Sequence, residues 1–305
     1  MKTIKLAKNS GFCFGVKRAI KLAEETAQKH GKAITLGPII HNPQMVENLQ
    51  KKGVSVADDT IVIGDEPVII RSHGIPRETL DILKTKKNQI VDATCPYVAK
   101  AHEFAKIANQ EKYEIFILGN YQHPEVIALK SYINGNVYFY ESLDELPNKK
   151  FNKVAVICQT TQNIDNLKKL TSSLLPVCTE LRIFNTICNA TNVRQNSSLD
   201  LAKKSDLMIV IGGKNSSNTK MLAKLCSEFS ETKHIETAEE LSKEWFVNVD
   251  NIGLTAGAST PDWIIIDIYN KIKVIVGDAD DLVQSMDAIP GYKEESNEYE
   301  CSKRP

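Results

Sequence analysis

The chain has 305 residues, of which 42% are hydrophobic and 25% charged, and its 38 Lys and Arg balance 38 Asp and Glu. This composition is typical of a folded globular protein of two or three domains, and it excludes collagenous and disordered chains. Zero net charge argues against broad nucleic-acid binding, which requires surplus Lys and Arg to displace counterions from phosphates. Any anionic ligand must therefore be held by local groups.

Strands and helices are expected to alternate along the whole chain. Val16, Ala19, Ile20, Ala23 and Ala27 recur at helical spacing in a helix that begins near residue 15 and ends at residue 31. Short apolar runs predict strands at residues 3–6, 33–36, 68–71, 89–92, 113–118, 153–158, 206–211 and 251–254. This alternation predicts an α/β fold with mostly parallel sheets, which bind ligands at the carboxyl ends of their strands.

Three cysteines divide the chain at near-even intervals. Cys13, Cys95 and Cys188 each lie beside an expected strand end or helix start. We therefore predict three pseudo-equivalent α/β domains around a shared centre. They would cover residues 14–95, 96–188 and 189–277, with residues 1–13 completing the third, and an acidic, mobile tail would cover residues 278–305, where Cys301 has no functional role.

Membrane and secretion signals are not expected. The N-terminal segment lacks an apolar stretch of signal-peptide length, and the runs at residues 207–211 and 263–266 are too short to span a bilayer. The seven cysteines form an odd set without a CxxC pair. We expect a cytoplasmic protein without membrane contact, in which each thiol is a packing residue, a metal ligand or a nucleophile.

The sequence context separates the cysteines into two groups. Packing is the simplest interpretation for Cys158 and Cys226, which lie in apolar strand and helix patterns, and for Cys178, which follows an apolar run. Cys13, Cys95 and Cys188 instead lie at turns, among groups that can donate hydrogen bonds to a thiolate.

Several polar residues allow both a structural and a functional interpretation. His41, His73 and His123 each end an apolar or loop segment, where a histidine can cap a helix or contact a ligand. Glu125 follows Pro124 and can be a simple helix-start charge. Hydroxyl and amide side chains also gather at expected helix starts, where they can cap the helices or form two neutral cradles for a phosphate. They are Ser216, Ser217, Asn218, Thr219, Ser259 and Thr260. No Walker loop supports nucleotide hydrolysis.

Nine ordered motifs between about residues 2 and 275 make the pattern specific. They are GFCFGVKRAI, HNPQMVENL, RSHGIP, DATCPYVAKAH, HPEV, QTTQ, NTICNATNVRQ, GGKNSSNT and TAGASTPDW. Together they resemble the 4-hydroxy-3-methylbut-2-enyl diphosphate reductase family, also called IspH or LytB. Residues 127 and 128, where the family often has a glycine, and the polar tail depart from the family pattern.

The resemblance implies one 4Fe–4S cluster, held by Cys13, Cys95 and Cys188, with one iron open to the allylic hydroxyl of the substrate. It implies that the diphosphate is bound by His41, His73, Ser216, Asn218 and Ser259, with Ser217 alongside. Glu125, Thr160 and His123 would surround the hydroxyl, with Glu125 as the proton donor of raised pKa. The implied products are isopentenyl and dimethylallyl diphosphate, at the last step of the non-mevalonate (MEP/DOXP) pathway, and the implied electron donor is a ferredoxin or flavodoxin.

Two other classes of function remain open from the residues alone. A metal-binding regulator would use the same thiols for sensing, but it requires a basic helix-turn-helix, which the sequence does not reveal. A zinc hydrolase could use three cysteines and a water molecule, because soft sulfur ligands suit both metals. The iron content of anaerobically purified protein distinguishes these possibilities.

Overall fold

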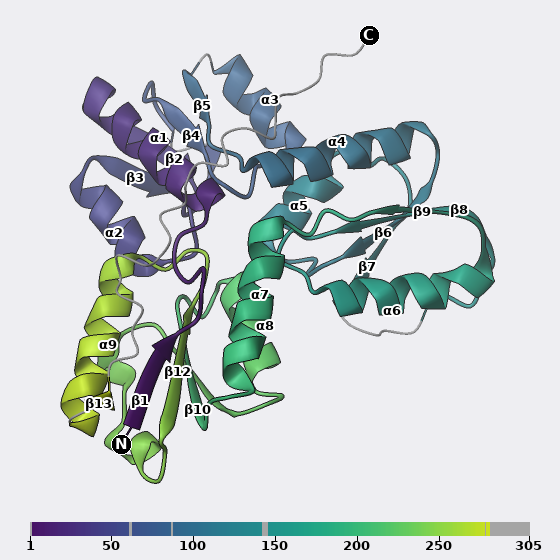
Figure 1. Cartoon of the computed structure of the whole chain (residues 1–305). Coiled ribbons are helices and arrows are strands. Elements are labelled where there is room, and N and C mark those ends of the chain that lie inside the picture. Colours follow the sequence, from purple (N-terminus) through teal and green to yellow (C-terminus); the bar gives the residue numbers. More distant parts are fainter. Residues whose placement is uncertain (1, 61–62, 87, 142–145, 278, 281–305) are drawn as a thin grey trace, which may run out of the picture.

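The computed structural model describes residues 2–60, 63–86, 88–141, 146–277 and 279–280. These residues form three separate sheets, each with its own helices (Figure 1). Every strand pairing among the described residues is parallel. The predicted fold class, three α/β units with mostly parallel sheets, is confirmed.

The first sheet has the strand order β3-β2-β4-β5. Its strands are β2 (Ala33–Leu36), β3 (Val54–Ala57), β4 (Val68–Ile70) and β5 (Ile90–Asp92), and its helices are α1 (Phe14–His30), α2 (Pro43–Lys51) and α3 (Arg77–Thr85). The helix expected to end at Gly31 does so, because Gly31 adopts the left-handed conformation, with φ of 77°, that closes a helix. The apolar stripe of α1 packs on this sheet, with Ala19 and Ala23 fully buried.

The second sheet has the order β7-β6-β8-β9. Its strands are β6 (Glu114–Leu118), β7 (Val137–Tyr140), β8 (Phe151–Cys158) and β9 (Cys178–Phe184), and its helices are α4 (Pro96–Gln110), α5 (Pro124–Lys130) and α6 (Ile164–Leu174), which continues into a 3₁₀ turn (Leu175–Val177). Figure 1 shows α4 and α6 on opposite sides of this sheet. Its central strands β6 and β8 are apolar on both faces, as strands covered on both sides must be.

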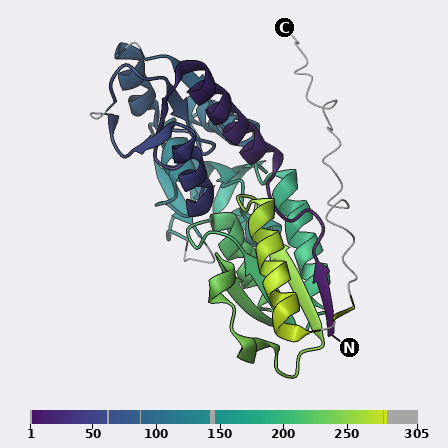
Figure 2. The same cartoon turned by 90° about the vertical axis from the view of Figure 1, so that its left-hand side faces the viewer.

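The third sheet combines the two ends of the described chain in the order β11-β10-β12-β1-β13. Its strands are β1 (Lys2–Leu6), β10 (Leu207–Ile211), β11 (Glu231–Ile235), β12 (Asn251–Ala256) and β13 (Ala279–Asp280); its helices are α7 (Asn189–Ala202), α8 (Ser217–Cys226) and α9 (Asp262–Val276), with 3₁₀ turns at Ala238–Glu240 and Lys243–Phe246. β1 pairs with β12, so the first residues of the chain do complete this sheet. In the perpendicular view, the first and third sheets lie at opposite ends of the molecule (Figure 2).

All eight expected strands are present, with ends shifted by at most two residues. The strands that the sequence did not predict, β3, β7, β9, β11 and β13, all lie at sheet edges. These four-residue or mixed-polarity strands are partly exposed: β3 and β7 are short, and β9 and β11 carry polar and charged residues among the apolar ones. The exact domain boundaries stay a prediction.

The acidic tail predicted for residues 278–305 begins too early. Ala279 and Asp280 form β13, which pairs in parallel with Lys2 and Thr3. The remaining tail residues, Cys301 included, lie outside the described part of the chain. Within the described residues, no helix is long and apolar enough to cross a membrane.

Candidate functional site

One cavity lies where the three sheets meet, with about 700 Å³ of empty space including its open mouth. Neither Thr219 nor Thr260, two of the candidates for a phosphate cradle, lines it. It is lined by the twelve residues to which the family resemblance gave a role: Cys13, His41, His73, Cys95, His123, Glu125, Thr160, Cys188, Ser216, Ser217, Asn218 and Ser259. These residues come from strand ends and helix starts of all three sheets. Ligand sites of parallel sheets form at these places, because helix N-termini present unpaired N–H groups there.

The three cavity cysteines occupy equivalent positions. Cys13, Cys95 and Cys188 are the N-cap residues of α1, α4 and α7, one helix for each sheet. Figure 1 shows the starts of these helices converging at the centre of the molecule. A thiolate at such a position is stabilised by the helix dipole and by the first N–H groups of the helix.

The surroundings of the thiols are suited to a shared soft metal centre. A methyl group on Gly15 would lie 2.6 Å from Cys95 Sγ, which is too close, so glycine leaves room for this sulfur atom; Cys13 Sγ lies 4.0 Å from the same position. The pKa of Cys95 is raised to about 12, mainly by burial and also by the neighbouring Cys13 and Cys188, against the lowering effect of backbone N–H groups. Three neighbouring thiolates would repel one another, but a bound metal centre would neutralise their charge.

Cys188 also receives local hydrogen bonds. The backbone N–H of Thr191 lies 3.3 Å from Cys188 Sγ, and the Thr191 hydroxyl lies 3.0 Å from it. Both contacts lower the pKa of Cys188, while burial, the largest effect, raises it. Thr191 thus stabilises the thiolate form that a metal ligand requires.

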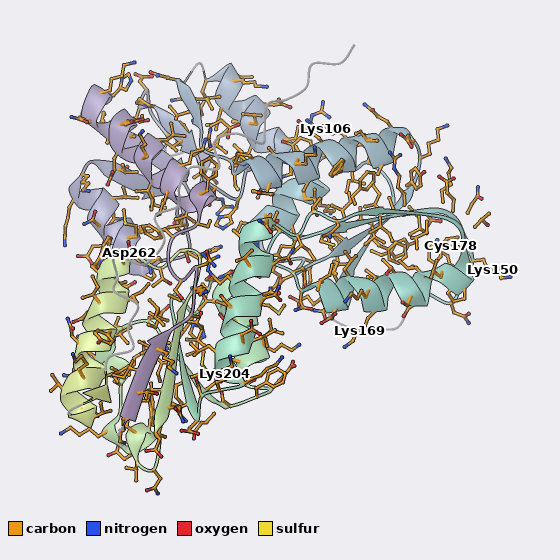
Figure 3. The ribbon with its side chains drawn as sticks, viewed as in Figure 1. Lys106, Lys150, Lys169, Cys178, Lys204 and Asp262 are labelled. Atoms are coloured by element: carbon orange, nitrogen blue, oxygen red, sulfur yellow. The ribbon has the colours of Figure 1, made fainter. Side chains whose placement is uncertain are left out.

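The other described cysteines lie elsewhere. Cys158 and Cys226 are fully buried in the cores of the second and third units. Cys178 begins β9 and lies at the outer end of the second sheet, far from the convergence of α1, α4 and α7 (Figure 3). These placements agree with packing as the interpretation of the three side chains.

Glu125 is a buried acid held by one partner. The backbone N–H of Thr160 lies 2.6 Å from Glu125 Oε1, and the Thr160 hydroxyl lies 2.9 Å from Oε2. Burial raises the pKa of Glu125 to about 7, although both Thr160 contacts lower it. The carboxyl can therefore hold or release a proton near neutral pH, as a general acid must. Since Cys188 N–H donates to Thr160 O over 3.0 Å, the acid is linked to a cavity thiol through one residue.

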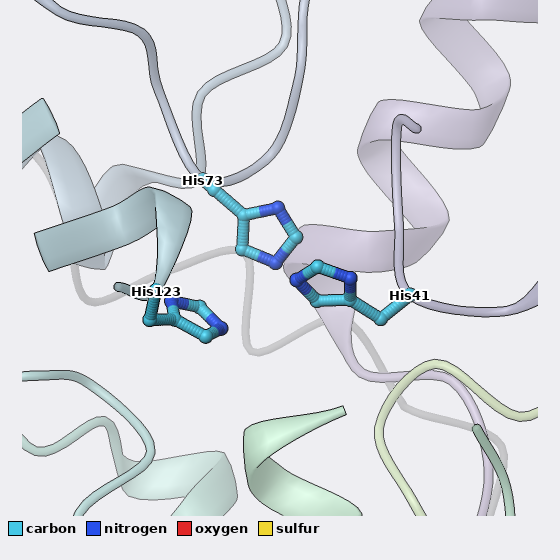
Figure 4. Close-up of side chains that lie close together, drawn as sticks. All are labelled: His41, His73 and His123. Carbon is cyan, nitrogen blue, oxygen red and sulfur yellow. The ribbon is translucent and has the colours of Figure 1, made fainter. Parts of the chain in front are cut away.

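Three histidines form a compact cluster in the lining of the same cavity. The ring centroids of His41 and His73 lie 4.5 Å apart, and each lies 5.3 Å from His123 (Figure 4). His123 caps α5 by accepting the Glu125 N–H at Nδ1, which leaves Nε2 for other contacts. His41 Nε2 and His73 Nδ1 are buried without a hydrogen-bond partner in the part of the chain described. A ligand is the natural partner for such orphaned ring nitrogens.

The histidines are neutral in the free protein. Burial is the largest cause in each case, lowering the pKa of His41 to about 4, that of His123 to about 3, and that of His73 well below its usual value. After burial, the neighbouring histidines contribute most to the lowered pKa of His73 and His123, and Arg71 contributes at all three rings; Lys220 contributes at His41 and His123. A positive field of this kind favours an anion in the space beside the rings.

The third unit supplies neutral donors that face the same cavity. Ser216 caps α8 by accepting Thr219 N–H, and both side-chain atoms of Asn218 are buried without a partner among the described residues. Ser217 Oγ lies 3.0 Å from Thr161 Oγ1 of the second unit, and Ser259 Oγ donates to His41 O over 3.2 Å. The predicted phosphate cradle thus lies at a helix N-terminus beside the histidines.

Four residues around the site were not predicted as functional: Arg71, Thr161, Thr191 and Arg194. Arg194 is 3% exposed, and its Nη2 donates to Gly11 O over 2.8 Å, which ties α7 to the segment before Cys13. All four residues lie within motifs of the family pattern: RSHGIP, QTTQ and NTICNATNVRQ. The motifs therefore indicated the segments that contain them. Their roles depend on contacts between units, which a linear pattern does not reveal.

Comparison with known proteins assigns the family. The profile of the LytB protein family matches residues 4–273. The chain belongs to the LytB family. Among LytB relatives, the 4-hydroxy-3-methylbut-2-enyl diphosphate reductase of Geobacter sulfurreducens is 48% identical over 274 residues, which cover 88% of this chain and 96% of that protein. The Campylobacter hominis protein of the same name is 48% identical over 276 residues, covering 89% and 99%.

Solved LytB structures share the fold. The Plasmodium falciparum E-1-hydroxy-2-methyl-but-2-enyl-4-diphosphate reductase superposes with a TM-score of 0.81 at 30% identity, covering 89% of this chain and 88% of that one. A structure of (E)-4-hydroxy-3-methyl-but-2-enyl diphosphate reductase, described as the terminal enzyme of the non-mevalonate pathway, gives a TM-score of 0.65 at 43% identity, covering 90% and 100%. The family resemblance inferred from the motifs is confirmed.

Proposed function

We propose that this LytB chain reduces 4-hydroxy-3-methylbut-2-enyl diphosphate to isopentenyl and dimethylallyl diphosphate, the last step of the non-mevalonate pathway. The reaction consumes two electrons and two protons, breaks the allylic carbon–oxygen bond and releases water. One observation supports it most strongly. A single cavity has a buried proton donor, Glu125, with three thiols and a cluster of anion-binding groups along its wall.

The proposal places a 4Fe–4S cluster on Cys13, Cys95 and Cys188, so that one iron has no protein ligand. When bound, this cluster supplies the electrons and a Lewis-acidic position for the substrate hydroxyl. The chain itself supplies the three N-cap thiolates, the Thr191 hydrogen bonds to Cys188 and the space beside Gly15.

Glu125 carries the proton for the leaving oxygen. Hydroxide is a poor leaving group, so the carbon–oxygen bond breaks readily only if the oxygen receives a proton as it departs. Burial keeps a substantial fraction of Glu125 protonated at neutral pH, and Thr160 fixes the orientation of its carboxyl group. His123, joined to the Glu125 backbone by its capping hydrogen bond, completes the wall around the hydroxyl.

The diphosphate lies at the histidine end of the cavity in this proposal. His41 and His73 have buried ring nitrogens without partners, and Asn218 has an amide in the same condition. Ser216, Ser217 and Ser259 add hydroxyl donors, and the N-terminus of α8 adds backbone N–H groups. Neutral donors directed at one anion are suitable for a protein with zero net charge.

The proposal also includes a cytoplasmic location and a ferredoxin or flavodoxin as the electron carrier. It competes with a zinc hydrolase, which the same three thiols permit. Anaerobic purification followed by iron, sulfide and zinc analysis separates the two. We expect about four irons and four sulfides per chain, and conversion of the allylic diphosphate to both products with a chemical one-electron donor. Stoichiometric zinc, or iron-loaded protein without turnover, would contradict the proposal.

A further inference from the structure

Arg71 lies behind the three-histidine cluster, at the end of β4 and two residues before His73. It is largely buried, and its Nε donates to Gly74 O over 3.4 Å. A methyl group on Gly37 would lie 2.6 Å from Arg71 Nη1, so the guanidinium packs directly on the glycine backbone. Arg71 is not among the residues that line the cavity. It therefore places a buried positive charge next to the site without contacting the ligand space.

The charge of Arg71 acts on all three rings at once. It lowers the pKa of His41, His73 and His123, although burial is the larger cause for each. Lys220 acts on His41 and His123 as well, but its side chain is exposed, and water screens its charge. Arg71 is therefore the more effective source of positive potential at the cluster.

Without this charge, the cluster would be a good site for a transition metal. His41, His73 and His123 each offer a ring nitrogen, and these three atoms lie within 4.8 Å of one another. Three imidazoles with an open fourth position form a common zinc site. A metal ion needs the lone pairs of these nitrogens, whereas a phosphate needs N–H groups at the same place. The two kinds of ligand therefore exclude each other.

We propose that Arg71 is a specificity-determining positioning residue, whose buried charge makes the three-histidine cluster accept a diphosphate and reject divalent transition-metal ions. The proposal rests on the diphosphate site described under the proposed function. Its physical basis is selection by repulsion: the same charge attracts the anion and raises the free energy of a cation beside it. A divalent cation experiences twice the repulsion of a monovalent one, so even a partly screened guanidinium discriminates strongly.

The test measures the affinities for diphosphate and for Zn²⁺, which the proposal predicts to change in opposite directions. Cluster-loaded protein is titrated separately with inorganic diphosphate and with Zn²⁺, with iron content and melting temperature checked for each variant. Arg71→Gln should weaken diphosphate binding about tenfold or more and should tighten Zn²⁺ binding by a similar factor. Arg71→Lys should restore both affinities towards the parent. Arg77→Gln removes an exposed charge six residues further along, on α3, and should change neither.

The opposite changes in the two affinities distinguish a change in ligand selectivity from a structural defect, because a defect would weaken the binding of both ligands. Arg71→Met keeps the apolar stem and provides a second neutral variant. Equal loss of both affinities, or no change in either, in a folded neutral variant would overturn the proposal. A parent protein that fails to bind diphosphate would instead contradict the proposed function. A zinc site that persists when His41→Asn is added to Arg71→Gln would show that the ion binds elsewhere, and this too would overturn the proposal.

Discussion

Thr160 holds both carboxyl oxygens of Glu125, one with its backbone N–H at 2.6 Å and the other with its hydroxyl at 2.9 Å. Glu125 lies in the first turn of α5, after β6, and Thr160 lies in the turn after β8. The same Thr160 accepts the N–H of Cys188 through its carbonyl, so the acid, its orienting group and a candidate cluster ligand form one connected unit. Glu125 cannot rotate without breaking two hydrogen bonds.

Replacing Glu125 with Gln should separate binding from chemistry. The amide keeps the size of the side chain and can still accept the Thr160 N–H, but it has no acidic proton to transfer. We expect kcat to fall about 100-fold to 10,000-fold with a smaller change in KM. Glu78→Gln, which changes an exposed first-turn carboxylate of α3, serves as the control and should keep parental kcat. A stable, cluster-loaded Glu125→Gln protein with parental kcat would remove Glu125 from the mechanism.

The dependence of kcat on pH should change when the hydrogen bond from the Thr160 hydroxyl to Glu125 is removed. Since the pKa of Glu125 is raised to about 7, the acid is loaded below that pH, and kcat should fall as pH rises above it. Thr160→Val removes a donor that lowers this pKa, so the basic limb of the profile should move to higher pH. Thr160→Ser keeps the hydroxyl and should leave the limb in place. An unchanged limb in Thr160→Val would show that another group controls the profile.

The stability of the cluster-free protein has a related pH dependence. The folded-state pKa of Glu125 lies above its usual value of 4.5, so the protonated carboxyl favours folding. This contribution is complete below about pH 4.5 and is lost as pH rises through about 7. Glu125→Gln should therefore flatten the dependence of unfolding free energy on pH between these values, as measured by denaturant titration. An identical slope in parent and variant would contradict the assignment.

Variants of the individual cysteines should fall into two classes according to the iron content of the purified protein. Cys13→Ser, Cys95→Ser and Cys188→Ser each remove one N-cap thiol, so we expect loss of most iron and sulfide from anaerobically purified protein. Cys178→Ser is the matched control at the outer end of the second sheet and should keep its cluster. Buried Cys158 and Cys226, changed to Ala, should lose some stability by leaving small cavities but should retain iron. A fully loaded Cys95→Ser would contradict the ligand set.

Asn218 should contribute to ground-state binding of the substrate. Its amide is buried without a protein partner, and a hydrogen bond to a charged group contributes about 1.5–3 kcal/mol. Asn218→Ala should therefore raise the dissociation constant of the diphosphate substrate about 10-fold to 100-fold. Asn270→Ala, on the exposed face of α9, should leave the constant unchanged. Parental affinity in Asn218→Ala, measured by calorimetry on cluster-loaded protein, would show that the amide does not contact the ligand.

Diphosphate binding should take up protons at the histidines. The pKa values of His41 and His123 are about 4 and about 3 in the free site, and a neighbouring anion raises them. Affinity should thus rise as pH falls towards the pKa values of the histidines, and calorimetry in buffers of different ionisation enthalpy should show proton uptake. Subtracting the proton uptake of His41→Asn from that of the parent removes the contribution of the ligand's own protonation. Equal proton uptake by the two proteins would exclude His41 as a linked group.

The hydrophobic pattern and the order of the motifs were sufficient to predict the fold class, the central strands and the family from the sequence alone. Central strands such as β10, and β6 after its first residue Glu114, are apolar because both faces of the sheet are covered, so they could be recognised locally. The turn contexts of Cys13, Cys95 and Cys188 identified the three N-cap thiols, and the ordered motifs identified the family.

Only the tertiary structure decided the features that depend on contact between units. The edge strands β9 and β11 mix polar and charged residues with apolar ones, and β3 and β7 are only four residues long, so hydrogen bonding to a neighbouring strand decides their conformation. The pKa of Glu125 is set by burial that residues distant in sequence create. Arg71 becomes a charge beside three histidines only when the ends of β2, β4 and β6 come together. Burial and electrostatics act through space, so a linear pattern can name such residues but cannot assign their environment.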